Sequence, residues 1–362
     1  MYKKVFLPIV VVMLLSTIIG GCAPAAEPQT VEVEVTRVVE VEVEAEAEEA
    51  APMEEEEKVV KVFGAFATPI EEPWDGVVHS ALEIVAEEGL IEYSYTEDIG
   101  YAGDMERVLR EVCEEQAPDL IVGDSYGNEE AARRVAADYP EIAFAFGSGV
   151  NPTEPNFAVF DNWLHEPAYI IGMLAGGLTE TNVVGVVAAQ PVPEVNRIVN
   201  AFIDGAKEVN PEVTVLVSFI NGWFDPATAK EQAQAHIDSG ADVLFAERFG
   251  VIEAAAENGL WAFGNMADQW ELAPDYVVSS TVWDWEPTIR YLVKQVKAGS
   301  FEAIDLKDFS MVAKGGASVA PYHDTEDKIP QDLKDLVAEK YQELLDGSFR
   351  VNINDSPPEL VN

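Results

Sequence analysis

From Val59 onward, short apolar runs alternate with segments of helical periodicity. The apolar runs are roughly four to eight residues long and nearly continuous, as is typical of parallel strands covered on both faces. Between them, apolar positions recur with the spacing of amphipathic helices. This order of strand, loop and helix predicts right-handed βαβ units on a parallel sheet.

Two series of such units are predicted. The first has strands at 59–66, 91–96, 119–122, 142–146 and 157–160, and helices at 76–88, 104–116 and 128–138. The second has strands at 183–188, 213–220, 243–246 and 261–264, and helices at 167–178, 194–209, 227–239 and 251–258. The remaining elements are strands at 277–282 and 311–312 and helices at 286–297 and 333–345.

The pattern therefore predicts an α/β fold of two doubly wound parallel-sheet lobes joined by a hinge, for which 362 residues suffice. We expect the first lobe to comprise 58–163 plus 277–310, and the second 164–276 plus 311–350. No G-x-G-x-x-G or Walker-type sequence follows the strands, so no nucleotide cofactor is expected.

The small residues of the 167–178 helix predict that a neighbouring element packs closely against it. They are Gly172, Ala175, Gly176 and Gly177. Cys113 lies alone on an apolar helical face, where we expect a small buried hydrophobe rather than a nucleophile.

The N-terminal residues resemble a targeting signal. Two lysines precede an apolar run at 5–19, and Cys22 directly follows Gly20-Gly21. This order is typical of a secretory signal, and the cysteine placement resembles a bacterial lipobox. We expect a signal peptide at 1–21, lipidation of Cys22, and an extracytoplasmic protein held at the cell membrane by its lipid anchor only. The alternative is an incidental cysteine at the end of a plain signal peptide.

Acidic residues dominate the chain. Residues 23–57 contain 13 glutamates and one arginine, so we predict that 22–57 form a self-repelling, extended tether. The Val-Glu alternation there could form a strand, but one face would carry a row of like charges. The whole chain has 22 Lys and Arg against 66 Asp and Glu, a net charge of −44. Such a field repels nucleic acid and anionic lipid, so neither is an expected partner.

Signatures of catalysis are sparse. The chain contains no H-E-x-x-H sequence and no Cys/His cluster with metal-ligand spacing. Pairs of acidic residues are unavoidable in so acidic a chain and indicate a solvated face. We therefore expect no enzyme activity, no cofactor and no metal site.

Aromatic residues recur where predicted strands end. These positions are Trp74 beside Asp75, Tyr126, Trp163, Trp223, Phe249 beside Arg248, and Trp283 with Trp285. Ligands of open α/β sheets bind at the carboxyl ends of the strands. The coincidence predicts a cleft for a flat, apolar-faced ligand, held between rings of the two lobes. For each ring taken separately, packing in the core is the competing interpretation.

Two of these positions raise specific questions. Trp223 lies in a turn between a predicted strand and a predicted helix, so we expect it to contact the ligand. Its neighbour Phe224 would point the other way and pack. Arg248 has two interpretations: it forms an ion pair between the lobes, or it binds an anionic group of the ligand.

Six segments, in this order and spacing, carry a family resemblance. They are Glu71-Glu72-Pro73-Trp74-Asp75, Tyr169-Ile170-Ile171-Gly172, Ala201-Phe202-Ile203-Asp204-Gly205-Ala206-Lys207-Glu208-Val209-Asn210-Pro211, Gly222-Trp223-Phe224-Asp225-Pro226, Ser239-Gly240-Ala241-Asp242-Val243 and Gly264-Asn265-Met266-Ala267-Asp268-Gln269. Over about residues 58–320 the chain resembles the basic membrane protein family of bacterial lipoproteins. These are substrate-binding components of ABC importers and include purine nucleoside receptors.

The resemblance implies a periplasmic-binding-protein type I fold with three hinge crossings, which closes on its ligand and delivers it to an ABC permease. In the family a purine lies between aromatic rings of the two lobes, which implies Trp74 and Trp223 here. Acidic and amide groups read the base edge, which implies Glu71, Asp75 and Asn265.

Two positions depart from the family pattern. Nucleoside-binding relatives carry an Asp for the ribose hydroxyls where this chain has Met266, and a Lys where it has Trp283. Without those partners the ribose hydroxyls would be buried unpaired. We therefore expect a bare purine-type nucleobase as the ligand. The alternatives are a nucleoside receptor, a lipoprotein that senses ligand for a signalling receptor, and a secreted nucleoside hydrolase.

Overall fold

A computed structural model describes residues 59–359. The predicted signal peptide, the lipidation site at Cys22 and the acidic tether lie outside these residues. Within the described part, every helix is too short or too polar to cross a membrane.

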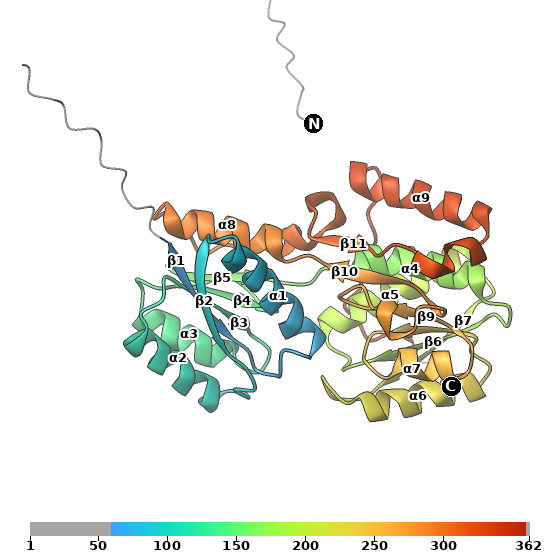
Figure 1. Cartoon of the computed structure of the whole chain (residues 1–362), viewed down its shortest axis with the longest axis horizontal. Coiled ribbons are helices and arrows are strands. Elements are labelled where there is room, and N and C mark those ends of the chain that lie inside the picture. Colours follow the sequence, from blue (N-terminus) through green and yellow to red (C-terminus); the bar gives the residue numbers. More distant parts are fainter. Residues whose placement is uncertain (1–58, 360–362) are drawn as a thin grey trace, which may run out of the picture. The chain divides into compact units, whose positions relative to one another are not determined.

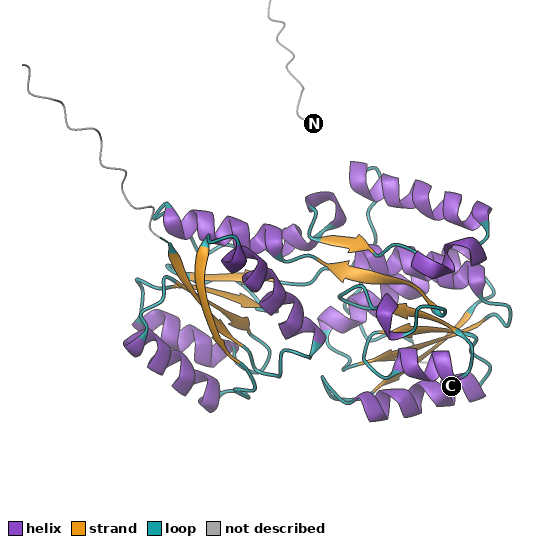
Figure 2. Cartoon of the chain, viewed as in Figure 1, coloured by secondary structure: helices purple, strands orange, loops and turns teal. Residues whose placement is uncertain are grey.

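The first lobe contains a five-stranded, wholly parallel sheet in the order β2-β1-β3-β4-β5 (Figures 1 and 2). Its strands are β1 (Val60–Ala65), β2 (Ile91–Thr96), β3 (Leu120–Asp124), β4 (Ala143–Gly147) and β5 (Phe157–Phe160). Its helices are α1 (Pro73–Glu87), α2 (Gly103–Glu115) and α3 (Glu129–Asp138). Alternate residues of β1 face opposite ways: Val62 packs with α1, while Phe63 packs with α2 and α3.

The second lobe contains a six-stranded sheet in the order β11-β10-β9-β8-β6-β7, parallel except for the antiparallel edge strand β11. Its strands are β6 (Val183–Ala188), β7 (Thr214–Phe219), β8 (Val243–Ala246), β9 (Trp261–Gly264), β10 (Val277–Trp283) and β11 (Ala317–Val319). Its α-helices are α4 (His165–Leu178), α5 (Pro193–Val209), α6 (Pro226–Asp238), α7 (Val251–Glu257) and α9 (Gln331–Asp346). Its short 3₁₀ turns are η1 (Trp270–Leu272), η3 (Val312–Lys314) and η4 (His323–Lys328), while a further turn, η2 (Lys307–Ser310), packs on β5 of the first lobe.

The chain passes between the lobes more than once. It leaves the first sheet after β5 and enters α4 of the second lobe. After β10 it returns as α8 (Glu286–Lys297), which packs on α1 and β1 of the first lobe, and it then enters the second lobe again to form β11 (Figure 1).

The predicted fold class of two α/β lobes with parallel sheets is confirmed. Two details of the prediction are wrong. Residues 277–283 pair with β9 in the second lobe, so the return to the first lobe begins only after Trp283. Residues 311–312 form no strand, because Met311 links two 3₁₀ turns and the final strand follows at 317–319.

The close packing predicted for α4 is confirmed at its contact with α5. A Cβ added to Gly172 would lie 2.2 Å from the carbonyl oxygen of Phe202, and one on Gly205 would lie 2.0 Å from that of Tyr169. Only glycine permits backbones to approach this closely, so α4 and α5 form the interior of the second lobe.

The substitution Gly172→Ala tests this contact. Overpacking of a tight core commonly costs about 1–3 kcal/mol, so we expect a loss of that size in the free energy of unfolding, measured by urea titration and circular dichroism. Gly103→Ala is the matched control, because no atom lies within 4 Å of an added Cβ at the start of α2. A Gly172→Ala protein as stable as the parent would refute the packing argument.

Candidate functional site

A cavity lies where loops after strands of both sheets meet. The first lobe lines it with Thr68, Glu72, Trp74, Asp75, Tyr101, Asp124, Tyr126 and Ser148. The second lobe adds Glu194, Trp223 and Arg248. The cavity measures about 30 Å³, far less than the roughly 300–1,000 Å³ of most small-molecule sites. We call this arrangement closed, because it leaves no room for an organic ligand between the lobes.

Direct contacts join the two lobes around this cavity. Arg248 Nη1 donates to Glu72 Oε1 at 2.7 Å, and both side chains are buried. Ser148 Oγ donates to Glu194 Oε2 at 2.7 Å. The hydroxyl of Tyr126 donates to Gln190 Oε1 at 3.4 Å. Each of these contacts joins a residue of one lobe to a residue of the other.

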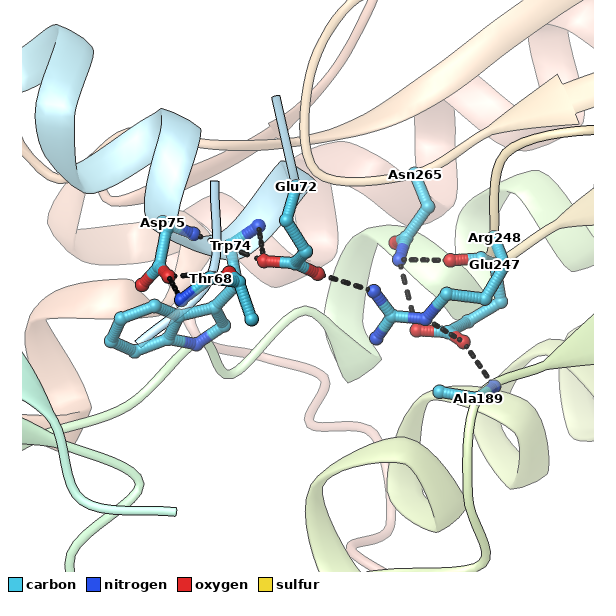
Figure 3. Close-up of polar contacts among 8 residues, drawn as sticks. All are labelled: Thr68, Glu72, Trp74, Asp75, Ala189, Glu247, Arg248 and Asn265. Carbon is cyan, nitrogen blue, oxygen red and sulfur yellow. Dashed lines mark hydrogen bonds and ion pairs between the residues drawn. The ribbon is translucent and has the colours of Figure 1, made fainter. Parts of the chain in front are cut away.

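Glu72 positions the start of helix α1. Its backbone is extended, and Pro73 follows at the first helical position, where a missing N–H is harmless. Glu72 Oε2 accepts hydrogen bonds from the backbone N–H groups of Trp74 at 2.8 Å and Asp75 at 3.2 Å (Figure 3). Trp74 therefore lies on the first turn of a helix, whereas the sequence predicted a loop.

Arg248 is held by a second carboxylate as well. Its Nε donates to Glu247 Oε2 at 3.0 Å, and that oxygen also accepts the backbone N–H of Ala189 at 2.9 Å (Figure 3). Asn265 Nδ2 donates to the other oxygen of Glu247 at 3.3 Å. Of the two interpretations of Arg248, the ion pair between the lobes is the one realised.

Three carboxyl groups in the cavity have raised pKa values. Burial, with Glu72 nearby, raises the pKa of Asp75 to about 7. Burial, with Asp161 nearby, raises the pKa of Glu194 to about 7 as well. Burial and the proximity of Asp75 also raise the pKa of Asp124 well above its ordinary value. Burial is the largest cause in each case, and at Glu194 the nearby Arg197 and Arg248 offset it only in part.

Several buried polar atoms at the cavity have no hydrogen-bond partner among the described residues. They are Asp75 Oδ1 and the indole nitrogens of Trp74 and Trp223. Buried polar groups are nearly always paired in native proteins, so unpaired ones beside a cavity indicate contact with a ligand or water.

The aromatic rings of the cavity come from both lobes. One face of Trp74 stacks on Phe160, with ring centroids 5.7 Å apart and planes at 15°. Trp223 meets the ring of Tyr126 edge to face at 4.7 Å, and the guanidinium carbon of Arg248 lies 5.3 Å from the centroid of Trp223.

The structure brings together five of the residues predicted for the site: Trp74, Asp75, Tyr126, Trp223 and Arg248. The other four lie elsewhere. Glu71 is exposed, and Asn265 lies behind Glu247. Trp163 donates through its indole N–H to Asp161 at 3.2 Å, and Trp283 donates to Ser310 at 3.0 Å within the core.

Two further expectations about individual side chains are affected. Phe224 does not pack in the core: 45% of it is exposed, and its ring meets that of Phe249 edge to face with centroids 6.2 Å apart. Met266 and Trp283 line a separate groove rather than the small cavity. Cys113 is a buried free thiol, as expected, and burial together with the proximity of Glu141 raises its pKa to about 11.

Sequence reasoning missed six residues of the cavity: Thr68, Glu72, Tyr101, Asp124, Ser148 and Glu194. Their places at the carboxyl ends of strands could have indicated two of them, because Asp124 ends β3 and Ser148 directly follows β4. Their acidic members were hidden among 66 Asp and Glu residues. The described residues contain no group of three or more His, Cys, Asp or Glu side chains arranged to hold a metal.

Comparison with known proteins identifies the family. The model of the Bmp family, described as ABC transporter substrate-binding protein PnrA-like, matches residues 67–308. The chain belongs to this family. Its members are solute-binding proteins rather than enzymes.

Two curated relatives with similar sequences are named for different ligands. TsgA13 of Haloferax volcanii, named as a candidate glucose-binding protein of an ABC transporter, is 36% identical over 215 residues, 59% of this chain and 54% of its own length. The match thus spans about half of that relative. A purine-binding protein of Brucella abortus is 27% identical over 261 residues, 72% of each chain.

A solved structure supports the fold. The solute-binding protein of an ABC transporter system from Conexibacter woesei aligns with a TM-score of 0.67 at 22% identity, covering 82% of this chain and 99% of its own.

Arg248→Met tests the ion pair between the lobes. Removing one partner of a buried pair leaves its carboxylates uncompensated, which commonly costs about 3–5 kcal/mol. We expect the variant to relieve that cost by opening, seen as a larger radius of gyration in small-angle X-ray scattering without ligand.

Arg290→Met is the matched control. Arg290 pairs with Glu88 at 2.7 Å on the surface, where ion pairs contribute roughly 0–1 kcal/mol. An unchanged radius for Arg248→Met, with the protein folded, would show that this pair does not hold the lobes together.

Proposed function

We propose that this protein is an extracytoplasmic binding lipoprotein, lipidated at Cys22, that captures a purine-type nucleobase and delivers it to an ABC permease. The observation that carries the proposal is the closed cavity between two lobes, where aromatic rings lie beside unpartnered polar atoms. Closure is the mechanism, because the Arg248–Glu72 pair and the ligand contacts form together and give the permease a distinct state to recognise.

The rings support a flat ligand. Trp74 packs against Phe160 and Trp283 and also lines the cavity, while Trp223 approaches from the opposite lobe. The indole N–H groups suit the ring nitrogens or carbonyl oxygens of a purine, and Asp75 suits an N–H of its edge. The purine-binding relative from Brucella abortus agrees with this choice.

A bare base is proposed over a nucleoside. The family resemblance implies polar ribose contacts at the positions of Met266 and Trp283, and neither residue lines the cavity here.

A sugar is the second candidate. Carboxylates beside tryptophan rings also suit hydroxyl groups and the apolar face of a pyranose, and the Haloferax relative is named for glucose. A sensing role, in which the closed state contacts a signalling receptor, shares the same binding step.

Titration by intrinsic tryptophan fluorescence tests the ligand class. We expect adenine, guanine or xanthine to bind more tightly than its nucleoside and than glucose. Tighter binding of nucleosides would refute the argument from Met266 and Trp283. Binding of glucose alone would show that the ligand is a sugar rather than a purine.

Trp223→Ala tests the ring contact. Truncating an aromatic anchor commonly costs 2 kcal/mol or more, so we expect the affinity to fall by about thirtyfold or more while the circular dichroism spectrum is unchanged. Phe224→Ala is the matched control, since the adjacent ring is exposed and outside the cavity. Equal affinity in both variants would assign Trp223 a packing role.

A further inference from the structure

The charges that line the cavity do not balance. Four carboxyl groups, those of Glu72, Asp75, Asp124 and Glu194, face one guanidinium, that of Arg248. The guanidinium is already paired with Glu72 and, behind the cavity, with Glu247. Among the described residues, Asp75, Asp124 and Glu194 therefore form no ion pair.

Each of these three carboxyl groups uses one oxygen to accept from the protein. Asp75 Oδ2 accepts from the backbone N–H of Thr68 at 3.0 Å and from its hydroxyl at 2.5 Å. Asp124 Oδ1 accepts from the N–H of Tyr126 at 2.9 Å, and Glu194 Oε2 accepts from Ser148 at 2.7 Å.

The second oxygen of each group receives no donor from the described residues. For Asp75, which is 2% exposed, that oxygen is buried without a partner. The cavity thus presents three acceptors to its ligand, while its one guanidinium is already engaged.

The rings around these acceptors favour positive charge as well. Tryptophan and tyrosine faces attract cations through their quadrupole, and a cage of such rings is a known way to bind organic cations. Trp74, Tyr101, Tyr126 and Trp223 line the cavity, and Trp223 already has the guanidinium of Arg248 within 5.3 Å of its centroid.

We propose that the cavity selects an organic cation: a flat heterocycle or amidinium that carries a positive charge and several N–H donors. This inference rests on the binding role proposed above and narrows the ligand from a neutral purine base to a charged one. A neutral ligand would leave unpaired carboxylates in the closed cavity unless they took up protons. A cation satisfies them directly.

The pH dependence of binding follows from the surrounding charges. Glu72, Tyr101, Tyr126 and Arg248 face the three carboxyl groups within the cavity, while Asp161 and Arg197 lie beside Glu194. Since the pKa values of Asp75 and Glu194 are about 7, these groups ionise as the pH rises from 6 to 8. A ligand of fixed positive charge should therefore bind more tightly at pH 8 than at pH 6, and a neutral ligand should not.

Isothermal titration of the full chain with two matched probe pairs tests the proposal. Benzamidinium and benzamide differ mainly in charge, and so do 7,9-dimethylguaninium and 9-methylguanine. We expect the cation of at least one pair to bind tenfold or more tightly than its neutral partner. The preference for benzamidinium should grow from pH 6 to pH 8, whereas 7,9-dimethylguaninium loses its N1 proton near neutral pH and is left out of the pH comparison.

Substitutions of single carboxyl groups test whether these groups cause the preference for a cation. Asp124→Asn should reduce cation affinity at least tenfold and leave the affinity for the neutral probe unchanged or improved. Glu194→Gln provides the same test from the other lobe if Asp124→Asn does not fold. Asp332→Asn, exposed on α9, is the control and should alter neither affinity.

The outcomes separate the two proposals. Equal or tighter binding of both neutral probes overturns the cation proposal, and if 9-methylguanine binds, the purine function stands. A preference for benzamidinium with no binding of either guanine probe supports the charge class and overturns the purine function. Binding of no probe overturns the cation proposal, while the titration with unmodified purines decides the function separately.

Discussion

The buried contact of Arg248 with Glu72 and Glu247 is the constraint on which the closed molecule depends. Glu72 serves two purposes with its two oxygens: one fixes the first turn of α1, and the other pairs with the opposite lobe. Trp74 and Asp75 are therefore oriented by the same side chain that joins the lobes. Because a buried charge is costly without its partner, the state of the lobes and the geometry of the binding residues change together.

This coupling determines the charge inside the cavity. Closing the lobes removes several carboxyl groups from water but adds no cation beyond Arg248, whose charge is already matched. The aromatic rings contribute area and a preference for positive charge, but no compensating charge of their own. The carboxyl oxygens that remain unpaired need hydrogen-bond donors, and under our proposal the ligand supplies them. The charge of the ligand and the closing of the lobes then depend on each other.

Sequence pattern predicted much of the framework and part of the site. Near-continuous apolar runs identify buried parallel strands because both faces of such strands are covered, and Gly172 signalled a close helix contact because only glycine allows one. The pattern misplaced residues 277–283, since an apolar strand does not encode which sheet it joins. Likewise Trp163, Trp223 and Trp283 all follow predicted strands, yet Trp163 donates to Asp161, Trp223 lines the cavity and Trp283 packs in the core.

The sequence by itself determined the α/β class, the two lobes, the alternation of elements and the edge of each sheet at which the cavity lies, because these follow from local periodicity and chain direction. Only the tertiary structure decided that Glu72, Asp124 and Glu194 line the same cavity, and that Arg248 forms an ion pair with Glu72. These facts depend on distances between residues remote in sequence; the ion pair alone spans 176 positions. In a chain with 66 acidic residues, composition could not distinguish the few that are buried together from the many that water solvates.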